Sequence, residues 1–250
     1  MCSVRNWNMK IIHEPSDSSP FLVVFKPAGL PSAPLFEGDE SVLTETIRYF
    51  SQIALVHGKK EVEHGLVHRI DTETAGLVLI ATTQESFDKL IQSQKDGKFE
   101  KWYRADVDHI PDCAEILCGF PPAPNIIKNQ FVVESAFRPF GQKGREVRPV
   151  TQNAGRAALK KGGSAVYQTE ISFESENVAI CHIKSGFRHQ VRCHLAWCGF
   201  PVKGDKIYNP NFREKLFISE HAPESHEMKF TAFKISFPHP LTQIPLVFQM

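Results

Sequence analysis

The sequence predicts an α+β fold built on a mixed, largely antiparallel central sheet with flanking helices. Short apolar runs rich in β-branched residues recur along the chain and are typical of strand interiors. Two segments with helical spacing lie between them, so the order is strands, helix, strands, helix and strands rather than the regular alternation of a doubly wound sheet. With 250 residues, the chain can bury a substantial core as one large domain or two lobes.

The first elements lie between residues 21 and 50. Residues 21–25 (FLVVF) predict a strand, and the segment 26–34 after it is a turn whose proline and glycine residues cannot continue a ladder. Residues 41–49 predict a helix because their apolar side chains, with that of the next residue, fall near one face: Val42, Leu43, Ile47 and Phe50.

The next two strands, 65–67 and 77–81, enclose a charged turn. A helix follows them, because Thr82 and Glu85 have the spacing of a capping box in which the threonine side chain accepts from the amide of the glutamate. Gly97 is expected to end this helix.

The second half of the chain adds strands and one more helix. Residues 99–107 alternate like a half-buried strand, and residues 165–173 and 178–183 predict two strands joined by a short turn. A helix is expected within residues 187–199, before a glycine and a proline that close it.

The composition argues against a membrane protein and against a secreted one. Hydrophobic residues make up 42% of the chain, yet no apolar run approaches the roughly 20 residues that a bilayer-spanning helix needs. The N-terminal segment 1–20 lacks an apolar core followed by a cleavage site, so we expect a cytoplasmic protein.

Positive charge is concentrated in residues 121–163, although the net charge of the chain is only +1. Weak periodicity and many Pro, Gly, Asn and Gln residues predict a loop-rich insertion here. Such an insertion could contact phosphate groups, or it could be a solvated linker without a partner. Its local balance of +6 comes from Glu134 and Glu146 against eight basic residues: Lys128, Arg138, Lys143, Arg145, Arg148, Arg156, Lys160 and Lys161.

The most informative stretch is residues 64–81, HGLVHRIDTETAGLVLIA, where a charged HRID turn interrupts residues that otherwise read as buried strands. A carboxylate presented by a rigid sheet at a strand end, such as that of Asp71, is ionised at neutral pH and well placed to act as a nucleophile or base. Taken alone, the motif fits equally well a structural ion pair of Arg69 with Asp71, or a turn cap.

A second group of polar residues lies in residues 183–208. Arg188 and Arg192 are four apart and are expected to share a helix face, where they could bind phosphate or pair with a carboxylate. A plain surface stripe of arginines is the alternative.

The histidines allow a rival interpretation as a metal-dependent hydrolase. His64, His68 and Asp71 are spaced H-x3-H-x2-D, and His189 and His194 could complete a metal site. The segment reads as strand, however, where positions four apart lie roughly 13 Å from each other. We therefore predict no metal.

Four segments, in this order and spacing, resemble the RluA family of pseudouridine synthases: KPAGLP at 26–31, residues 64–81, KWYRA at 101–105 and SGFRHQVRCHLAWCGFPVKGDKIY at 185–208. The resemblance runs from about Phe21 to Tyr208 and more loosely to the end. It implies a catalytic domain at 21–250 with a central cleft, carrying the basic insertion at about 121–163, and residues 1–20 are too short for the RNA-binding domain of S4 type that often precedes it.

The resemblance implies an RNA pseudouridine synthase, an isomerase that converts specific uridines of rRNA or tRNA to pseudouridine. Such an enzyme needs no cofactor, acts on RNA rather than at a membrane, and has no obligatory protein partner evident in the sequence. A noncatalytic RNA-binding protein that kept the fold is a further alternative, although the catalytic positions of the family are intact here.

The resemblance also assigns roles to individual residues. Asp71 falls on the catalytic aspartate, Tyr103 would stack on the uracil, Arg192 would hold Asp71 in a buried ion pair, and Arg69 would enter the RNA. Further RNA contacts are expected from the other polar residues of the motifs: Lys26, His68, Thr74, Arg188, His189 and Gln190.

One departure from the family pattern affects this assignment. The family usually reads TGRTHQIR where this chain has SGFRHQVR, so Phe187 stands at a common arginine position and Arg188 at the next. Because one residue turns a helix by about 100°, Arg188 need not replace the missing arginine.

Overall fold

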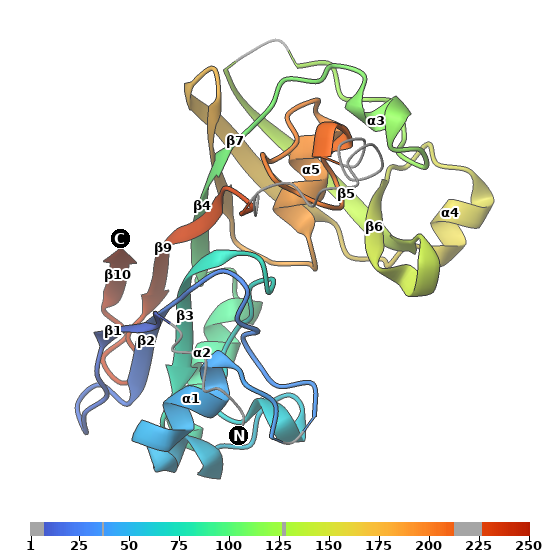
Figure 1. The fold of residues 1–250 in the computed structure, drawn as a ribbon. Coiled ribbons are helices and arrows are strands. Elements are labelled where there is room, and N and C mark those ends of the chain that lie inside the picture. Colours follow the sequence, from blue (N-terminus) through green and yellow to red (C-terminus); the bar gives the residue numbers. More distant parts are fainter. Residues whose placement is uncertain (1–7, 37, 127–128, 213–226) are drawn as a thin grey trace, which may run out of the picture. The chain divides into compact units, whose positions relative to one another are not determined.

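The computed structural model describes residues 8–36, 38–126, 129–212 and 227–250, and the chain divides into two compact units (Figure 1). The first unit comprises residues 1–101 and 231–250, and the second comprises residues 102–230. The chain therefore enters the second unit within strand β4 (Glu100–Asp106) and leaves it within β9 (Phe230–Pro238).

The first unit contains a mixed, largely antiparallel sheet, as predicted. Strand β2 (Phe21–Lys26) pairs antiparallel with β1 (Lys10–His13) and, along its whole length, with β3 (Ala75–Ala81). Strand β9 pairs antiparallel with β10 (Pro245–Gln249) and parallel with the start of β3. The parallel approach requires Gly76, since a Cβ there would lie 2.4 Å from the carbonyl oxygen of Ala232.

The helices of the first unit begin at side-chain caps. Helix α1 (Val42–Tyr49) is capped by Ser41, as expected for a helix starting there. Helix α2 (Gln84–Lys95) is capped by Thr83, which accepts from the amide of Ser86 at 3.2 Å, so the prediction of Thr82 as the cap is wrong by one residue. Two short 3₁₀ helices, η1 (Ser51–Leu55) and η2 (Glu61–Glu63), lie between α1 and the charged turn.

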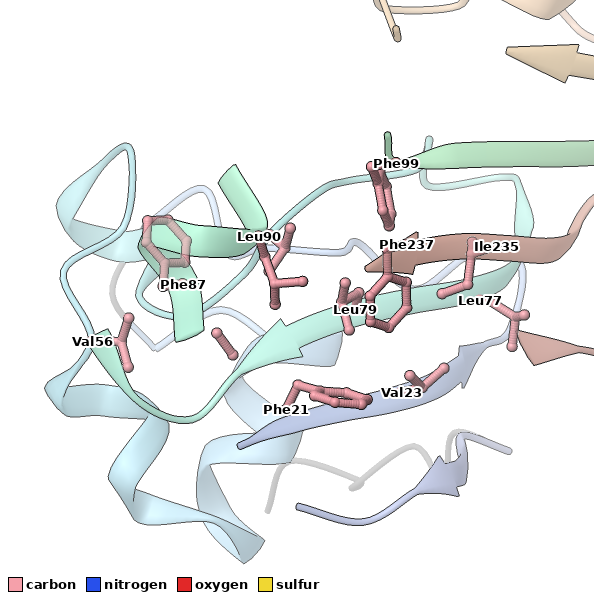
Figure 2. Packing of buried hydrophobic residues seen from close by; sticks show 12 residues of the cluster. Phe21, Val23, Val56, Leu77, Leu79, Phe87, Leu90, Phe99, Ile235 and Phe237 are labelled. Atoms are coloured by element: carbon pink, nitrogen blue, oxygen red, sulfur yellow. The ribbon is translucent and has the colours of Figure 1, made fainter. Parts of the chain in front are cut away.

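Side chains of β2, β3, α2 and β9 form the core of the first unit (Figure 2). Phe21 meets Phe237 edge to face with a centroid separation of 5.4 Å. All six residues of the FLVVFK strand are buried or nearly so, because both faces of β2 are covered. The charged turn thus adjoins the most buried strands of the first unit, β2 and β3.

The second unit contains strands in the order β4, β8, β7, β5 and β6. Strands β7 (Tyr167–Ser175) and β8 (Val178–Ile183) form the predicted hairpin. Helices α3 (Cys113–Ile116), α4 (Arg156–Lys161) and α5 (Gln190–Trp197) accompany these strands. In the part of the chain that the structure describes, no helix is both long and apolar enough to cross a membrane.

The prediction that residues 121–163 are rich in loops is wrong, because much of this segment is strand or helix. Strands β5 (Gln130–Phe140) and β6 (Glu146–Val150) pair with each other across the 3₁₀ turn η3 (Gln142–Gly144), and β5 also pairs with β7. Arg148 belongs to the core, because its guanidinium lies 4.4 Å and 4.2 Å from the ring centroids of Phe120 and Phe140. Of the other basic residues predicted there, Lys128 lies outside the described residues.

Candidate active site

Asp71 lies in a tight turn where a strand segment leaves the sheet. The amide of Val67 donates to the carbonyl of Leu79 at 3.1 Å, which continues the ladder beside β3. Four residues later, the carbonyl of Asp71 accepts from the amide of Thr74 at 3.0 Å and closes the turn. Asp71 itself is partly exposed, so the sheet presents its carboxylate at a strand end, as the sequence predicts.

The turn at residues 26–34, which contains the KPAGLP motif, holds the residues on both sides of Asp71. Ser32 Oγ donates to the carbonyl of Ile70 at 2.9 Å and accepts from its amide at 3.1 Å. On the other side, the carbonyl of Thr72 accepts from the amide of Gly29 and from Lys26 Nζ, both at 2.8 Å. The backbone that carries the carboxylate is therefore fixed by a segment about forty residues earlier in the chain.

Lys26 is fully buried beneath this turn. Its ammonium donates to three carbonyls, those of Pro27, Leu30 and Thr72, at 3.0, 2.7 and 2.8 Å. Burial lowers the pKa of Lys26 to about 7, although the negative charges of Asp71 and Glu73 act to raise it. Lys26 thus lies within electrostatic range of Asp71 but directs its hydrogen bonds to backbone carbonyls of the loop and of the Asp71 turn.

His68 completes the ladder at the point where the chain turns away. The amide of Leu79 donates to His68 Nε2 at 3.1 Å, so the ring replaces a strand carbonyl and carries its proton on Nδ1. Burial, with the positive charges of Lys101 and Lys59, holds the pKa of His68 well below its usual range.

Two other predicted residues of the turn differ in their exposure. The side chain of Arg69 is 58% exposed and pairs with Glu63 at 3.0 Å. Thr74 is buried, and its hydroxyl has no hydrogen-bond partner among the described residues. Of these two residues, only Arg69 has a polar group that is exposed to solvent.

Tyr103 lies in the second unit, on β4. Its ring is almost fully buried and stacks on Phe230 with a centroid separation of 5.0 Å and an interplanar angle of 10°. This stack fixes the orientation of the tyrosine ring by packing.

Arg192 forms a buried bidentate ion pair with Asp205. Its Nε and Nη2 atoms each donate to the Asp205 carboxylate at 2.7 Å. Although burial alone would raise the pKa of Asp205, Arg192 and the amides of Ile207 and Tyr208 lower it below the usual range. Asp205 was not expected from the sequence, although it lies in the GDKIY segment that carries the resemblance.

Arg188 lies outside helix α5. The helix begins at Gln190, after His189 in the left-handed region at φ 58°, so the expected shared face of Arg188 and Arg192 is wrong. Arg188 instead donates to the carbonyls of Gly144 and Glu146 in the β5–β6 turn.

The other two predicted residues of segment 185–208, His189 and Gln190, form hydrogen bonds within the second unit. His189 Nδ1 lies 3.1 Å from the hydroxyl of Tyr208. Gln190 is buried, and its Nε2 donates to the carbonyl of Gln168 at 2.8 Å while its Oε1 accepts from the amide of Phe187.

The predicted residues thus form two groups. Lys26, His68, Arg69 and Thr74 surround Asp71 in the first unit, and the second unit holds the others: Tyr103, Arg188, His189, Gln190 and Arg192. The predicted ion pair of Asp71 with Arg192 would join residues of different units and stays a prediction, as does the central cleft. Lys26, His68 and Gln190 use their polar atoms in hydrogen bonds with the backbone of the protein, which favours support of the site over direct contact with RNA.

The residues do not fit the histidine-based metal site. No group of three or more His, Cys, Asp or Glu side chains among the described residues could hold a metal ion. Both ring nitrogens of His194 are occupied, by the hydroxyls of Ser135 at 3.0 Å and Thr169 at 2.8 Å. The hydrolase alternative therefore lacks its ligands.

Comparisons with known proteins agree with the resemblance. The family model described as RNA pseudouridylate synthase matches residues 20–197. The ribosomal large subunit pseudouridine synthase D of Borreliella burgdorferi is 24% identical over 96% of this chain and 66% of its own length. The tRNA pseudouridine(31) synthase of Saccharomyces cerevisiae is 25% identical over 75% of this chain and 44% of its own.

A solved structure supports the fold. Human RNA Pseudouridylate Synthase Domain Containing 1 matches 97% of this chain and 83% of its own with a TM-score of 0.63 at 17% identity. The chain spans between 43% and 66% of the length of the first curated relatives that it matches.

Proposed function

The chain belongs to the RNA pseudouridylate synthase family, and from this premise we propose that it converts uridines of RNA into pseudouridine with Asp71 as the nucleophile. The observation that carries the proposal is the anchoring of the Asp71 turn through both neighbouring residues by the turn at residues 26–34. Preorganised placement of a reacting group contributes strongly to rate, because little motion remains to be frozen during the reaction.

The proposed reaction needs a nucleophile, which a carboxylate can supply, and it needs no redox group. The bond from ribose to a uracil nitrogen breaks, the base turns, and ring carbon 5 forms a new bond to the ribose. Carbon 5 loses its proton and the released nitrogen takes one up, so the product is an isomer of the substrate. Asp71 would attack either the anomeric carbon or the uracil ring, and both routes regenerate the free carboxylate.

Three other residues have supporting roles in this proposal. Tyr103, whose orientation is set by Phe230, would stack on the turned uracil and assist removal of the proton from carbon 5. Arg192, held by Asp205, would keep Asp71 ionised. Arg69 would leave Glu63 and enter the RNA stack in place of the flipped nucleotide, which its exposure allows.

The substrate is proposed to be rRNA or tRNA, in the cytoplasm. The similar proteins named above act on either kind of RNA according to their names, so the family does not favour one. Recognition would use the exposed arginines of the two units, with no cofactor and no obligatory protein partner.

The test is to map pseudouridine in the RNA of cells that contain or lack this protein. Asp71→Asn keeps the shape of the side chain but removes its charge, and it should restore no modified site. Asp88→Asn, the same change on the exposed side of α2, should restore all of them. Modification restored by Asp71→Asn would contradict the proposed nucleophile, and identical maps with and without the protein would contradict the function.

A further inference from the structure

Lys101 is a buried lysine without a counter-charge. It lies at the start of β4 with 7% of its surface exposed, and its ammonium is 5.2 Å from the ring centroid of Phe99. Within the described ranges, Lys101 has no hydrogen bond or ion pair. Lys26, the other buried lysine, has three carbonyl acceptors and two nearby carboxylates.

A second lysine, Lys59, adds positive charge that lowers the pKa of Lys101. Lys59 Nζ donates to Gln94 Oε1 at 3.3 Å, and Gln94 Nε2 donates to the carbonyl of Val67 at 2.9 Å. This relay places Lys59 beside the strand that leads to the Asp71 turn. The side chain of Lys59 is exposed and can reach a ligand in solvent.

His68 and Lys101 both lie against the ring of Phe99. The ring centroid of His68 lies 4.9 Å from that of Phe99, whose ring also contacts the Lys101 ammonium. Burial and then Lys59 lower the pKa of Lys101 to about 8, and no carboxylate counters them. Lys59 and Lys101, here called the Lys59–Lys101 cluster, therefore form a positive region within the first unit, beside the neutral ring of His68.

Such a region is costly to the free protein. A buried ammonium loses hydration, and two like charges repel each other, so buried cations are normally paired with an anion. A bound anion would recover this energy. A function of the cluster in binding an anion would explain why the protein tolerates this free-energy cost.

We propose that the Lys59–Lys101 cluster binds a backbone phosphate of the RNA substrate. The proposal rests on the proposed function, and it adds a binding site to that function. The cluster suits RNA because Lys101 stands two residues before Tyr103 in the chain, and His68 stands three residues before Asp71. A phosphate bound here would position the strand that carries the target uridine.

The first test measures the binding of a fluorescein-labelled RNA hairpin with a uridine-rich loop by anisotropy, over a range of potassium chloride concentrations. Asp71→Asn serves as the parent protein, so that the RNA is not turned over. Lys101→Met should weaken binding about tenfold and reduce the slope of log affinity against log salt by about 0.7 to 0.9, the value for one lost phosphate contact. Lys59→Met should act in the same direction, while Lys10→Met on exposed β1 should leave both quantities unchanged.

The second test needs no substitution at the cluster. Trace acetylation of the wild-type protein, read by mass spectrometry, should show that the same hairpin protects Lys101 and Lys59 but not Lys10. Equal salt slopes for Lys101→Met and its parent, or equal labelling of Lys101 with and without RNA, would overturn the phosphate site. Absence of pseudouridine formation by wild-type protein that still binds the hairpin would contradict the proposed function alone.

Discussion

Ser32 Oγ makes two hydrogen bonds to the backbone of Ile70, accepting from the amide at 3.1 Å and donating to the carbonyl at 2.9 Å. Both partners are buried, and Ile70 precedes Asp71 directly. The Ser32 hydroxyl therefore satisfies the backbone of Ile70 as a neighbouring strand would. The position of the Asp71 carboxylate depends on this hydroxyl.

Ser32→Ala should lower kcat about 10- to 100-fold with little change in KM, because the Asp71 turn loses its restraint while the RNA contacts remain. Leaving two buried backbone groups unsatisfied should also cost about 1–3 kcal/mol of folding stability. Single-turnover kinetics and urea unfolding measure the two effects.

Ser86→Ala is the matched control. Ser86 is equally buried on α2, but its hydroxyl has no hydrogen-bond partner among the described residues. This variant should keep full activity and the stability of the wild-type protein. A kcat loss as large in Ser86→Ala as in Ser32→Ala would show that the effect is not specific to the turn.

The contrast between Asp71 and Ser32 shows what the sequence could predict. The strands around Asp71 have local apolar patterns, and a polar turn between them stands out by itself. The Ser32 and Lys26 contacts join segments about forty residues apart, and nothing in local spacing indicates such a contact. The KPAGLP loop was therefore associated with the site by resemblance alone.

The second unit was predicted less well, for two physical reasons. Residues 130–140 alternate between buried and exposed positions, but Arg138 and Pro139 conceal the period of two. Arg148 counts as surface charge in the sequence, whereas aromatic rings and backbone carbonyls accommodate it in the core. Likewise, the left-handed conformation of His189 delays the start of α5 and separates Arg188 from Arg192.

Asp205→Ala should destabilise the protein by about 3–5 kcal/mol, because it leaves the guanidinium of Arg192 buried without its partner. The amides of Ile207 and Tyr208 would lose their acceptor as well. The free energy of unfolding in urea measures this loss. Glu174→Gln, which breaks the exposed pair with Arg104, should change that free energy by less than about 1 kcal/mol. Similar losses in the two variants would contradict the importance assigned to the buried pair.

His194 should make folding sensitive to mild acid. Burial between Ser135 and Thr169 lowers the pKa of His194 to about 3, from the ordinary value of 6.5. Between these values the unfolded chain binds a proton that the folded chain excludes, so stability falls as the pH falls, by up to about 1.4 kcal/mol per pH unit.

The measurement compares urea unfolding at pH 7, 6, 5 and 4.5 for wild type and His194→Gln. The lowered pKa of Asp205 destabilises both proteins in acid, so the contribution of His194 is the difference between their slopes. The variant should be less stable at pH 7 but lose less stability with acid. Parallel pH profiles would show that His194 is not the acid-sensitive group.

The surface of α4 should contribute to the choice of RNA. Arg156, Lys160 and Lys161 are exposed on this helix, and no acidic residue occurs from residue 147 to residue 169. Replacing the three by glutamine should weaken RNA binding, reduce its salt dependence and change the relative rates for rRNA and tRNA transcripts, since phosphate contacts fix the register of an RNA on the protein. A matched triple variant of exposed lysines in the first unit, at Lys10, Lys95 and Lys98, separates this effect from loss of net charge. Because both variants lose three positive charges, equal changes in affinity and in RNA preference would assign the effect to overall charge and remove α4 from substrate recognition.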